Sequence, residues 1–144
     1  MTVAAILKHK GYQVTTVPPA TSIREVADLL ADRKIGAVLV MNHAEELLGI
    51  VSERDIVCGL SANGAATLEM TAGQLMTRAV QVVHPSTTEA EAMLIMTIGR
   101  FRHLPVLDKG VLVGLVSIGD VVKARIMQQE SEVDSLRAYV SGAA

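Results

Sequence analysis

Aromatic residues, cysteines and long apolar runs are all scarce in this chain of 144 residues. Only 2% of the residues are aromatic whereas 50% are hydrophobic, so the core has to be aliphatic, built from Val, Ile, Leu, Ala and Met. A single cysteine, Cys58, excludes a disulfide within the chain. Unpaired cysteine is typical of a reducing compartment, and we expect the protein in the cytoplasm.

Membrane and nucleic-acid functions have no support in the sequence. No apolar run approaches the roughly 18 residues that span a bilayer. The apolar residues near the N-terminus are not preceded by a basic segment, so we expect no signal peptide. The net charge is −2, which offers no basic surface for nucleic acid.

Catalytic and metal-binding motifs are also missing. The four histidines show no metal-ligand spacing, and Cys58 has no cysteine partner. None of the motifs of serine hydrolases, phosphate-binding loops or dinucleotide folds appears. We therefore predict a protein without a metal site, without a catalytic cofactor and without enzymatic activity.

What the chain does contain is an internal repeat. Residues Gly49–Val57 (GIVSERDIV) return as Gly114–Val122 (GLVSIGDVV), and Pro19–Ser22 (PATS) returns as Pro85–Thr88 (PSTT). The first motif recurs after 65 residues and the second after 66. The second copy is therefore one residue shorter in the loop between its two motifs, and a loop tolerates such a deletion. Copies of about 60 residues are marginal as independent folds, so we expect the two to share one core.

Both copies show the order strand, helix, strand, strand, helix. Capping boxes at Ser22–Glu25 and Thr88–Glu91 predict where the first helix of each copy begins. Continuous apolar runs predict strands buried on both faces. In the first copy we expect strands at Gln13–Val17, Ala37–Met41 and Leu47–Ser52, and a returning helix at Glu53–Leu60. In the second we expect strands at Val80–Val83, Leu104–Leu107 and Val111–Ser117, and a helix at Ile118–Glu130 that extends through Arg137.

Three further segments complete the expected organisation. Val3–Lys10 is predicted as a short leading helix that Gly11 stops. Ser61–Thr71 is rich in Ala, Gly, Asn and Thr and is expected to be a linker loop. The tail Ser141–Ala144 is expected to be frayed.

Each copy has a Ser-x-x-Asp motif where a strand passes into a helix, Ser52 with Asp55 and Ser117 with Asp120. One interpretation is a helix cap, with the serine at the N-cap and the aspartate in the first turn. The other is ligand binding, because a helix N-terminus offers N–H groups to a phosphate and an aspartate accepts hydrogen bonds from a ribose diol. The two are compatible, and the duplication of the motif favours the second.

A cluster of cationic residues precedes one of the buried strands. Arg100–Val106 (RFRHLPV) contains two arginines and a histidine, whereas the matching stretch Lys34–Val40 (KIGAVLV) has Gly36 and Ala37 in place of Arg102 and His103. The cluster is either a solvated basic surface or an anion-binding site, since arginine grips phosphate through a planar fork. On either interpretation the two copies cannot present equivalent sites.

The duplicated motif, the R-H-L-P-V run and the repeat order together resemble the tandem CBS-domain pair, or Bateman module, over most of the chain. The resemblance implies an α/β (α+β) fold in which two β-α-β-β-α units pack as a pseudo-twofold pair. The expected division is residues 1–60 for the first unit with its short N-terminal helix, 61–75 for a linker, 76–130 for the second unit, and 131–144 for a C-terminal helical extension and tail.

The resemblance also implies two nucleotide sites in the cleft between the units, each mixing the two copies. Carried over to this chain, one site is expected to use Ser52, Arg54 and Asp55 with Val82, Val83, His84, Arg102 and His103. The other is expected to use Ser117 and Asp120 with Thr16, Pro18, Ile35, Gly36 and Ala37. The aspartates would bind the ribose, and the serines and basic groups would bind the phosphate. The strand backbone would contact the adenine edge. Because the first set holds more cations, we expect it to bind phosphate more tightly.

The function that the resemblance implies is regulatory sensing of an adenine nucleotide. AMP is the first candidate ligand, and ATP, NAD(H) and S-adenosylmethionine are others. The alternative is a ligand-independent interaction scaffold, or a regulatory subunit of a separate effector protein. We also expect a homodimer, with helix residues left apolar after the copies pack as candidates for its interface: Ile56, Val57, Leu60, Val121, Val122 and Ile126.

Overall fold

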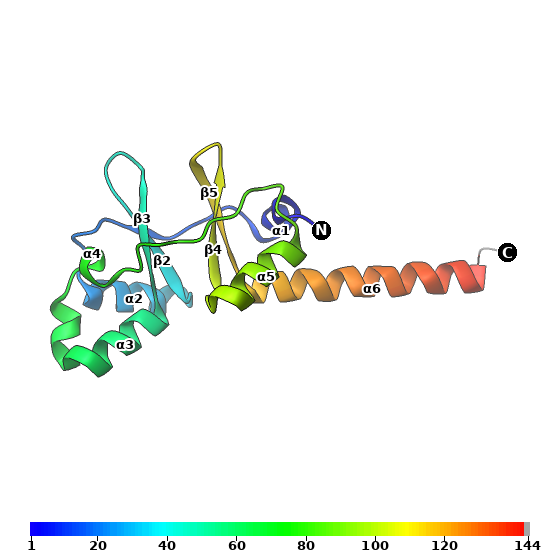
Figure 1. Ribbon diagram of the computed structural model, residues 1–144. Helices are drawn as coiled ribbons and strands as arrows, with labels where there is room; N and C mark the ends of the chain where they lie inside the picture. Colours follow the sequence, from blue (N-terminus) through cyan, green and yellow to red (C-terminus); the bar gives the residue numbers. More distant parts are fainter. Residues whose placement is uncertain (143–144) are drawn as a thin grey trace. The chain divides into compact units, whose positions relative to one another are not determined.

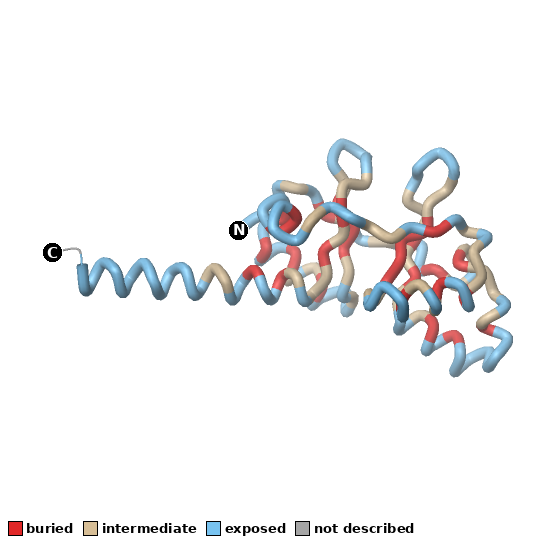
Figure 2. Tube along the Cα trace, turned by 180° about the vertical axis from the view of Figure 1, so that it is seen from behind, coloured by how far each residue is buried: buried red, intermediate tan, exposed pale blue. Residues whose placement is uncertain are grey.

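The computed structural model describes residues 1–142, which fall into two units (Figure 1). The first-repeat unit is residues 13–80, and the second-repeat unit combines residues 1–12 with residues from 81 onward. Each has its own aliphatic core, so the expectation of one shared core is not met. In Figure 2 the buried residues lie along the strands and on the helix faces that cover them. The mixed helix-and-strand fold that the sequence predicts is confirmed.

The first-repeat unit is built on a three-stranded sheet of order β1-β2-β3. Strand β1 (Thr16–Val17) runs parallel to β2 (Ala37–Met41), and β2 runs antiparallel to β3 (Leu47–Ser52). Its helices, in chain order, are α2 (Ile23–Arg33), α3 (Glu53–Asn63), the 3₁₀ helix η1 (Gly64–Glu69) and α4 (Ala72–Leu75).

The second-repeat unit has a smaller sheet. Strands β4 (His103–Asp108) and β5 (Val111–Ser117) pair antiparallel, and three helices complete the unit, α1 (Val3–Lys10), α5 (Glu89–Gly99) and α6 (Ile118–Gly142). Four predicted elements have the bounds that the structure shows: α1, β2, β3 and β5. Helix α6 is one continuous helix, longer than the predicted core segment with its extension to Arg137. Of the tail expected to fray, Ser141 and Gly142 are helical and residues 143–144 lie outside the described residues.

The predicted strand Val80–Val83 is wrong, because only Val83 pairs with the sheet, through a single parallel bridge to Val106. Val83 N donates to Pro105 O at 2.9 Å, and Leu107 N donates to Val83 O at 2.9 Å. The ladder cannot continue toward Gln81, because Pro105 has no N–H to donate. The first repeat has Leu39 at this position, and Leu39 N donates to Thr15 O at 3.1 Å.

The predicted linker loop is also wrong, since most of Ser61–Thr71 is helical. Helix α3 continues to Asn63 and ends at Gly64, whose positive φ of 63° a glycine adopts without strain. Helix η1 follows, with Thr67 fully buried. The alanines that suggested a small-residue linker are good helix formers, and packing of Leu68 and Met70 on the unit's core holds the segment in place.

The leading helix α1 packs in the core of the second-repeat unit, although sequence order places it beside the first. Val3, Ile6 and Leu7 are buried there, and Leu7 lies so close to Gly114 that an added Cβ would stand 2.8 Å from its Cδ2. Helix α4 plays the matching part in the first-repeat unit, where Met76 lies over Gly49. The helix that precedes each copy therefore covers the strand of the other copy.

Candidate functional site

Both Ser-x-x-Asp motifs form the same reciprocal cap at the start of a helix. Ser52 N and Ser52 Oγ donate to Asp55 Oδ2 at 2.8 and 3.0 Å, and Asp55 N donates back to Ser52 Oγ at 3.2 Å. Ser117 and Asp120 repeat the three bonds at 2.8, 2.9 and 3.2 Å. The capping interpretation is thus confirmed in both repeats. Because two of the three bonds in each cap use Oδ2 and none uses Oδ1, Oδ1 of each carboxylate can accept from another donor.

The two aspartates differ in their further partner. Asp120 Oδ2 accepts a hydrogen bond from Lys10 Nζ at 2.6 Å, and the same ammonium group donates to Leu115 O at 2.6 Å. Asp55 Oδ1 instead accepts from the hydroxyl of Thr77 at 3.2 Å. One cap therefore carries an ion pair, and the other carries a hydrogen bond from an uncharged hydroxyl.

The ion pair with Lys10 contributes to a lowered pKa of Asp120. Burial alone would raise the pKa of its carboxyl, but the Lys10 hydrogen bond and charge, with the backbone and hydroxyl of Ser117, hold that pKa below its ordinary value. The carboxylate is therefore ionised at neutral pH and fixed in direction by three donors.

The segments that precede the buried strands lie beside the caps of their own repeats. Ala37 pairs with Ser52, and Glu53 N donates to Gly36 O at 2.9 Å. In the second-repeat unit His103 pairs with Ser117, and Ile118 N donates to Arg102 O at 2.8 Å. The cationic end of β4 thus stands at the same sheet end as Asp120. Ile35 belongs to the turn after α2, where its N–H donates to Leu30 O at 3.1 Å.

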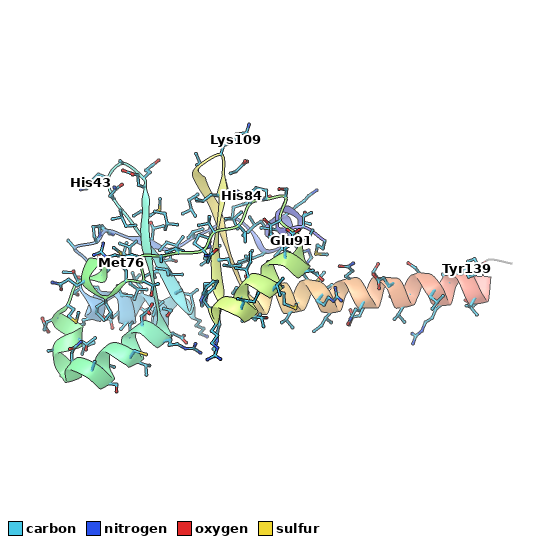
Figure 3. The ribbon with its side chains drawn as sticks, in the orientation of Figure 1. His43, Met76, His84, Glu91, Lys109 and Tyr139 are labelled. Carbon is cyan, nitrogen blue, oxygen red and sulfur yellow. The ribbon has the colours of Figure 1, made fainter. Side chains whose placement is uncertain are left out.

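The remaining expected site residues lie on the outer edge of each sheet. Thr16 is exposed on β1, next to Leu39 of β2, and Pro18 follows β1 as an exposed residue. Val82 and Val83 precede His84, whose backbone N–H donates to Thr87 Oγ1 at 3.0 Å. His84 Nδ1 lies 3.1 Å from Leu107 O, so a proton on Nδ1 would bond there (Figure 3).

The structure brings the expected residues together repeat by repeat. In the first-repeat unit Ser52 and Asp55 stand with Arg54, Ile35, Gly36 and Ala37, and in the second-repeat unit Ser117 and Asp120 stand with Arg102 and His103. The expected pairing of Asp55 with Arg102 joins residues of different units and stays a prediction. So does the pairing of Asp120 with Gly36.

Sequence reasoning missed Lys10 and Thr77. Lys10 is the last residue of α1 and Thr77 lies just after α4, and neither belongs to the echoed motifs, so no local signal marks them. The equivalence of α1 and α4, each preceded by a threonine cap and each lying over a strand glycine, would have directed attention to the residues at the ends of these helices.

Metal-binding and membrane-spanning features are absent from the described part of the chain. Across residues 1–142 no three His, Cys, Asp or Glu side chains are grouped as a metal would require. Over the same residues no helix combines the length and the apolar character needed to cross a bilayer.

Comparison with known families identifies the fold. The model of the CBS domain matches residues 4–61 and again 72–126, which together cover most of the chain. The chain belongs to the CBS-domain family. The relative "CBS domain-containing protein CBSX3, mitochondrial" of Arabidopsis thaliana is 31% identical over 98% of this chain and 72% of its own length. For further Arabidopsis relatives such as CBSCBSPB1 the chain spans 23% of the relative's length, so it corresponds to only a part of them.

Solved structures of CBS-domain proteins share the fold over nearly the whole chain. ATU1752 of Agrobacterium tumefaciens is 46% identical, with a TM-score of 0.84 over 86% of this chain and 92% of its own. CBSX2, solved in complex with AMP, is 29% identical, with a TM-score of 0.73 over 89% and 98%. PAE2072 of Pyrobaculum aerophilum, also complexed with AMP, is 26% identical, with a TM-score of 0.74 over 83% and 89%.

Proposed function

We propose that this CBS pair is a regulatory module that binds an adenine nucleotide, with AMP as the first candidate and ATP, NAD(H) and S-adenosylmethionine as others. The observation that carries the proposal is the duplicated cap, which orients an aspartate at the N-terminus of a helix in each repeat. The AMP complexes of CBSX2 and PAE2072, at 29% and 26% identity, support the same class of ligand.

The chemistry of the cap suits a nucleoside monophosphate. Oδ1 of each aspartate takes no part in the cap and can accept from a ribose hydroxyl, although at Asp55 this oxygen also accepts from Thr77. The positive end of the helix dipole at each cap suits a phosphate. Arg54, Arg102 and His103 add cations for the same phosphate, and residues Thr16 to Pro18 and Val82 to His84 offer backbone for the adenine edge.

Lys10 changes the expected ranking of the two sites. The set built on Asp120 was expected to hold fewer cations, yet the Lys10 ammonium lies 2.6 Å from its carboxylate. This ion pair partly neutralises Asp120, and it also adds positive charge near a bound phosphate. We therefore propose a smaller difference in AMP affinity between the two sites than the cations of β4 alone imply.

A ligand-independent scaffold is the rival, and the AMP-bound relatives do not favour it. The rival predicts that Asp55→Ala costs only what a lost helix cap costs, about 0.5–2 kcal/mol, and leaves every binding property unchanged. We propose further that the module has no enzymatic activity of its own and acts on a separate effector protein. We propose the cytoplasm as its compartment, and cell fractionation tests this against the mitochondrial location in the name of CBSX3.

Thermal unfolding with each candidate ligand tests the proposal. A ligand present at 100 times its dissociation constant should add about 2.7 kcal/mol to the free energy of unfolding. Adenosine is the matched control for AMP, because it lacks only the phosphate. An unchanged midpoint with AMP, ATP, NADH and S-adenosylmethionine alike would refute nucleotide binding.

We also propose that the protein is a homodimer. Of the six helix residues expected at the interface, Ile56 and Val121 are buried in the cores of their own units and are withdrawn from the set. Val57, Leu60, Val122 and Ile126 remain exposed, between 40% and 64% of each residue, and stay candidates. Light scattering at micromolar concentration should give the mass of two chains.

A further inference from the structure

Helix α6 continues far beyond the unit that it belongs to. Its first turns pack through Val121 and Ala124, but every residue from Gln129 to Gly142 is exposed (Figures 1 and 2). Isolated helices of this length are marginal in water. The packed first half of α6 supplies the nucleus, so the outer half needs only a partner surface to become stable.

From Val122 to Val140 helix α6 carries an apolar stripe with the spacing of a coiled coil. Steps of four and three residues alternate along it, which keeps the residues on one side of the helix. We call these residues the α6 stripe: Val122, Ile126, Gln129, Val133, Leu136 and Val140. The five apolar members are each at least 42% exposed, and Leu136 and Val140 reach 62% and 77%. In a single chain nothing in residues 1–142 covers them.

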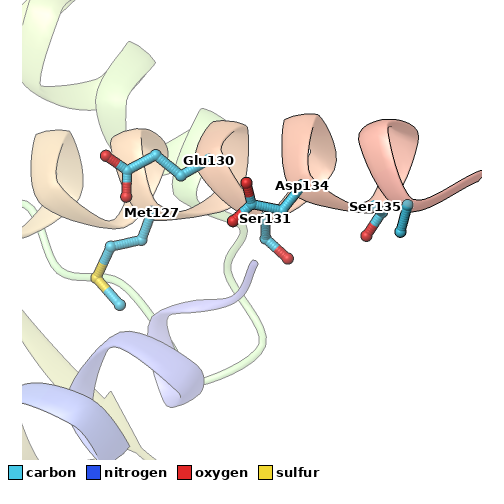
Figure 4. A pocket seen from close by; sticks show the side chains of 6 residues that line it. Met127, Glu130, Ser131, Asp134 and Ser135 are labelled. Atoms are coloured by element: carbon cyan, nitrogen blue, oxygen red, sulfur yellow. The ribbon is translucent and has the colours of Figure 1, made fainter. Parts of the chain in front are cut away.

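The opposite side of α6 is polar and holds a shallow open hollow. The hollow is lined by Met127, Glu130, Ser131, Asp134, Ser135 and Ala138 (Figure 4). Its residues alternate with those of the α6 stripe along the helix and point the other way. Polar and apolar residues are thus separated lengthwise on α6, as in a helix that pairs through one side.

We propose that the α6 stripe docks against the α6 stripe of a second copy, forming a parallel two-stranded coiled coil that links two chains. The residues that flank the stripe select this partner. In a parallel coil with the two helices in register, the residue that precedes Val133 faces the residue that follows Leu136 on the other helix, five positions later in the sequence. Glu132 of one copy then faces Arg137 of the other, and the symmetry gives this pair twice.

The other orientation of the same two helices is disfavoured by charge. Antiparallel overlap of the full stripe places Glu130 near its own counterpart and Glu132 near its own counterpart, so like charges meet on both sides. Like charges at flanking positions destabilise a coil. A second attractive pair in the parallel coil, Arg125 with Glu130, is weaker support, because Arg125 already binds Glu89 within its own chain at 2.9 Å.

The α6 coil specifies a surface for the homodimer proposed above and does not depend on nucleotide binding. Leu136→Glu places a charge within the stripe, and because Leu136 is exposed in the single chain the protomer should still fold. Light scattering should then give the mass of one chain where the unaltered protein gives two. Ser135→Glu is the matched control, since it puts the same charge on the adjacent residue, in the polar hollow, and should leave the dimer intact.

Cross-linking tests the parallel alignment. With Cys58→Ser as background, Val133→Cys places one thiol on the stripe at a position that faces itself in the parallel coil. Mild oxidation should give a covalent dimer, whereas Ser131→Cys, on the polar side, should give none. Arg137→Glu should weaken the dimer about three- to tenfold by setting two glutamates against each other. Adding Glu132→Arg should restore it.

Each outcome decides between the proposals. A monomeric unaltered protein overturns both the coil and the homodimer, and the AMP thermal shift still tests nucleotide binding separately. A dimer that survives Leu136→Glu overturns the coil and leaves the homodimer to another surface. A Leu136→Glu monomer without cross-linking at Val133→Cys overturns the parallel alignment.

Discussion

Asp55 and Asp120 occupy equivalent positions in the two repeats and make the same three cap bonds with their serines, within 0.1 Å of each other. Their surroundings nevertheless differ, because Thr77 donates to one and Lys10 to the other. The motif therefore sets the local geometry of each cap. Residues outside the motif, Lys10 at the end of α1 and Thr77 just after α4, set the further partner of each aspartate.

The same contrast holds for the sheets. Leu39 and Pro105 are equivalent, and only Leu39 has an N–H to extend the outer strand pairing, so the first repeat has a third strand and the second has one bridge. The two sheets therefore differ at a position where the residue type decides whether a ladder hydrogen bond can form. The changes below are ordered from the largest expected effect on this comparison to the smallest.

Leu7→Ala should produce the largest loss of stability. Leu7 is 1% exposed in the core of the second-repeat unit, and truncation of such a side chain costs about 2–5 kcal/mol. Because α1 packs on the second repeat, amide hydrogen exchange should rise in β4 and β5 more than in β2 and β3. The opposite pattern would mean that α1 belongs with the first repeat in solution.

Replacing the equivalent strand glycines with alanine should destabilise the two repeats to different extents. The Cβ of Gly49→Ala would lie 2.7 Å from the backbone oxygen of Thr77, whereas that of Gly114→Ala would meet only the flexible end of Leu7. Overpacking against backbone costs about 1–3 kcal/mol, so urea unfolding should show a larger loss for Gly49→Ala. Equal losses would argue against the tighter α4 contact.

Lys10→Met should make the two caps more alike. The folded-state pKa of Asp120 lies below the unfolded value of about 3.9, so its carboxylate stabilises the fold above that pH and the contribution is lost as pH falls through the folded pKa. Without Lys10 the pKa of Asp120 should rise, and less stability should be lost on acidification. Since the pair is partly exposed, the loss near neutral pH should be about 1 kcal/mol or less.

An NMR titration of the Asp120 carboxyl, in the unaltered protein and in Lys10→Met, measures this directly. Lys8→Met is the matched control, because it removes a lysine from the same helix and leaves the Lys10–Asp120 ion pair in place. If the pKa stays the same after removal of Lys10, the ion pair does not persist in solution.

Pro105→Leu should give the second repeat the backbone N–H that Leu39 supplies in the first. The new N–H can donate to Gln81 O and extend the single bridge at Val83 by one step. The net effect on stability should stay within about 1 kcal/mol, the usual worth of one hydrogen bond. Slow exchange of the residue 105 amide would show that the bond forms, and fast exchange would show that the missing N–H is not what limits the strand.

Elements with a strong local signal were predictable from the sequence. The runs Ala37–Met41, Leu47–Ser52 and Val111–Ser117 are continuously apolar and end at polar residues, and the caps at Thr88 and Ser52 are local hydrogen bonds. Features that depend on distant parts of the chain were not predictable. The Lys10 contact spans most of the sequence, Ile56 and Val121 are indistinguishable by pattern from their exposed neighbours, and the fate of Val80–Val83 depends on Pro105.

The candidate site likewise contains parts that were predictable from local sequence and parts that were not. Its caps and the strand ends beside them follow from short-range pairing, and the sequence places all of them. The expected union of Asp55 with Arg102 and of Asp120 with Gly36 depends on how residues of the two repeats combine around a ligand, and it stays a prediction.

Calorimetric titration with AMP tests the central claim most directly. We expect the unaltered protein to bind AMP at two sites, Arg102→Ala to weaken the site built on Asp55, and Asp120→Ala to weaken the other. Loss of a well-formed charge-assisted bond, about 1.5–3 kcal/mol, should lower the affinity of the affected site tenfold or more. Absence of AMP binding to the unaltered protein would contradict the proposed function, and weakening of one and the same binding event by both substitutions would contradict the two-site assignment.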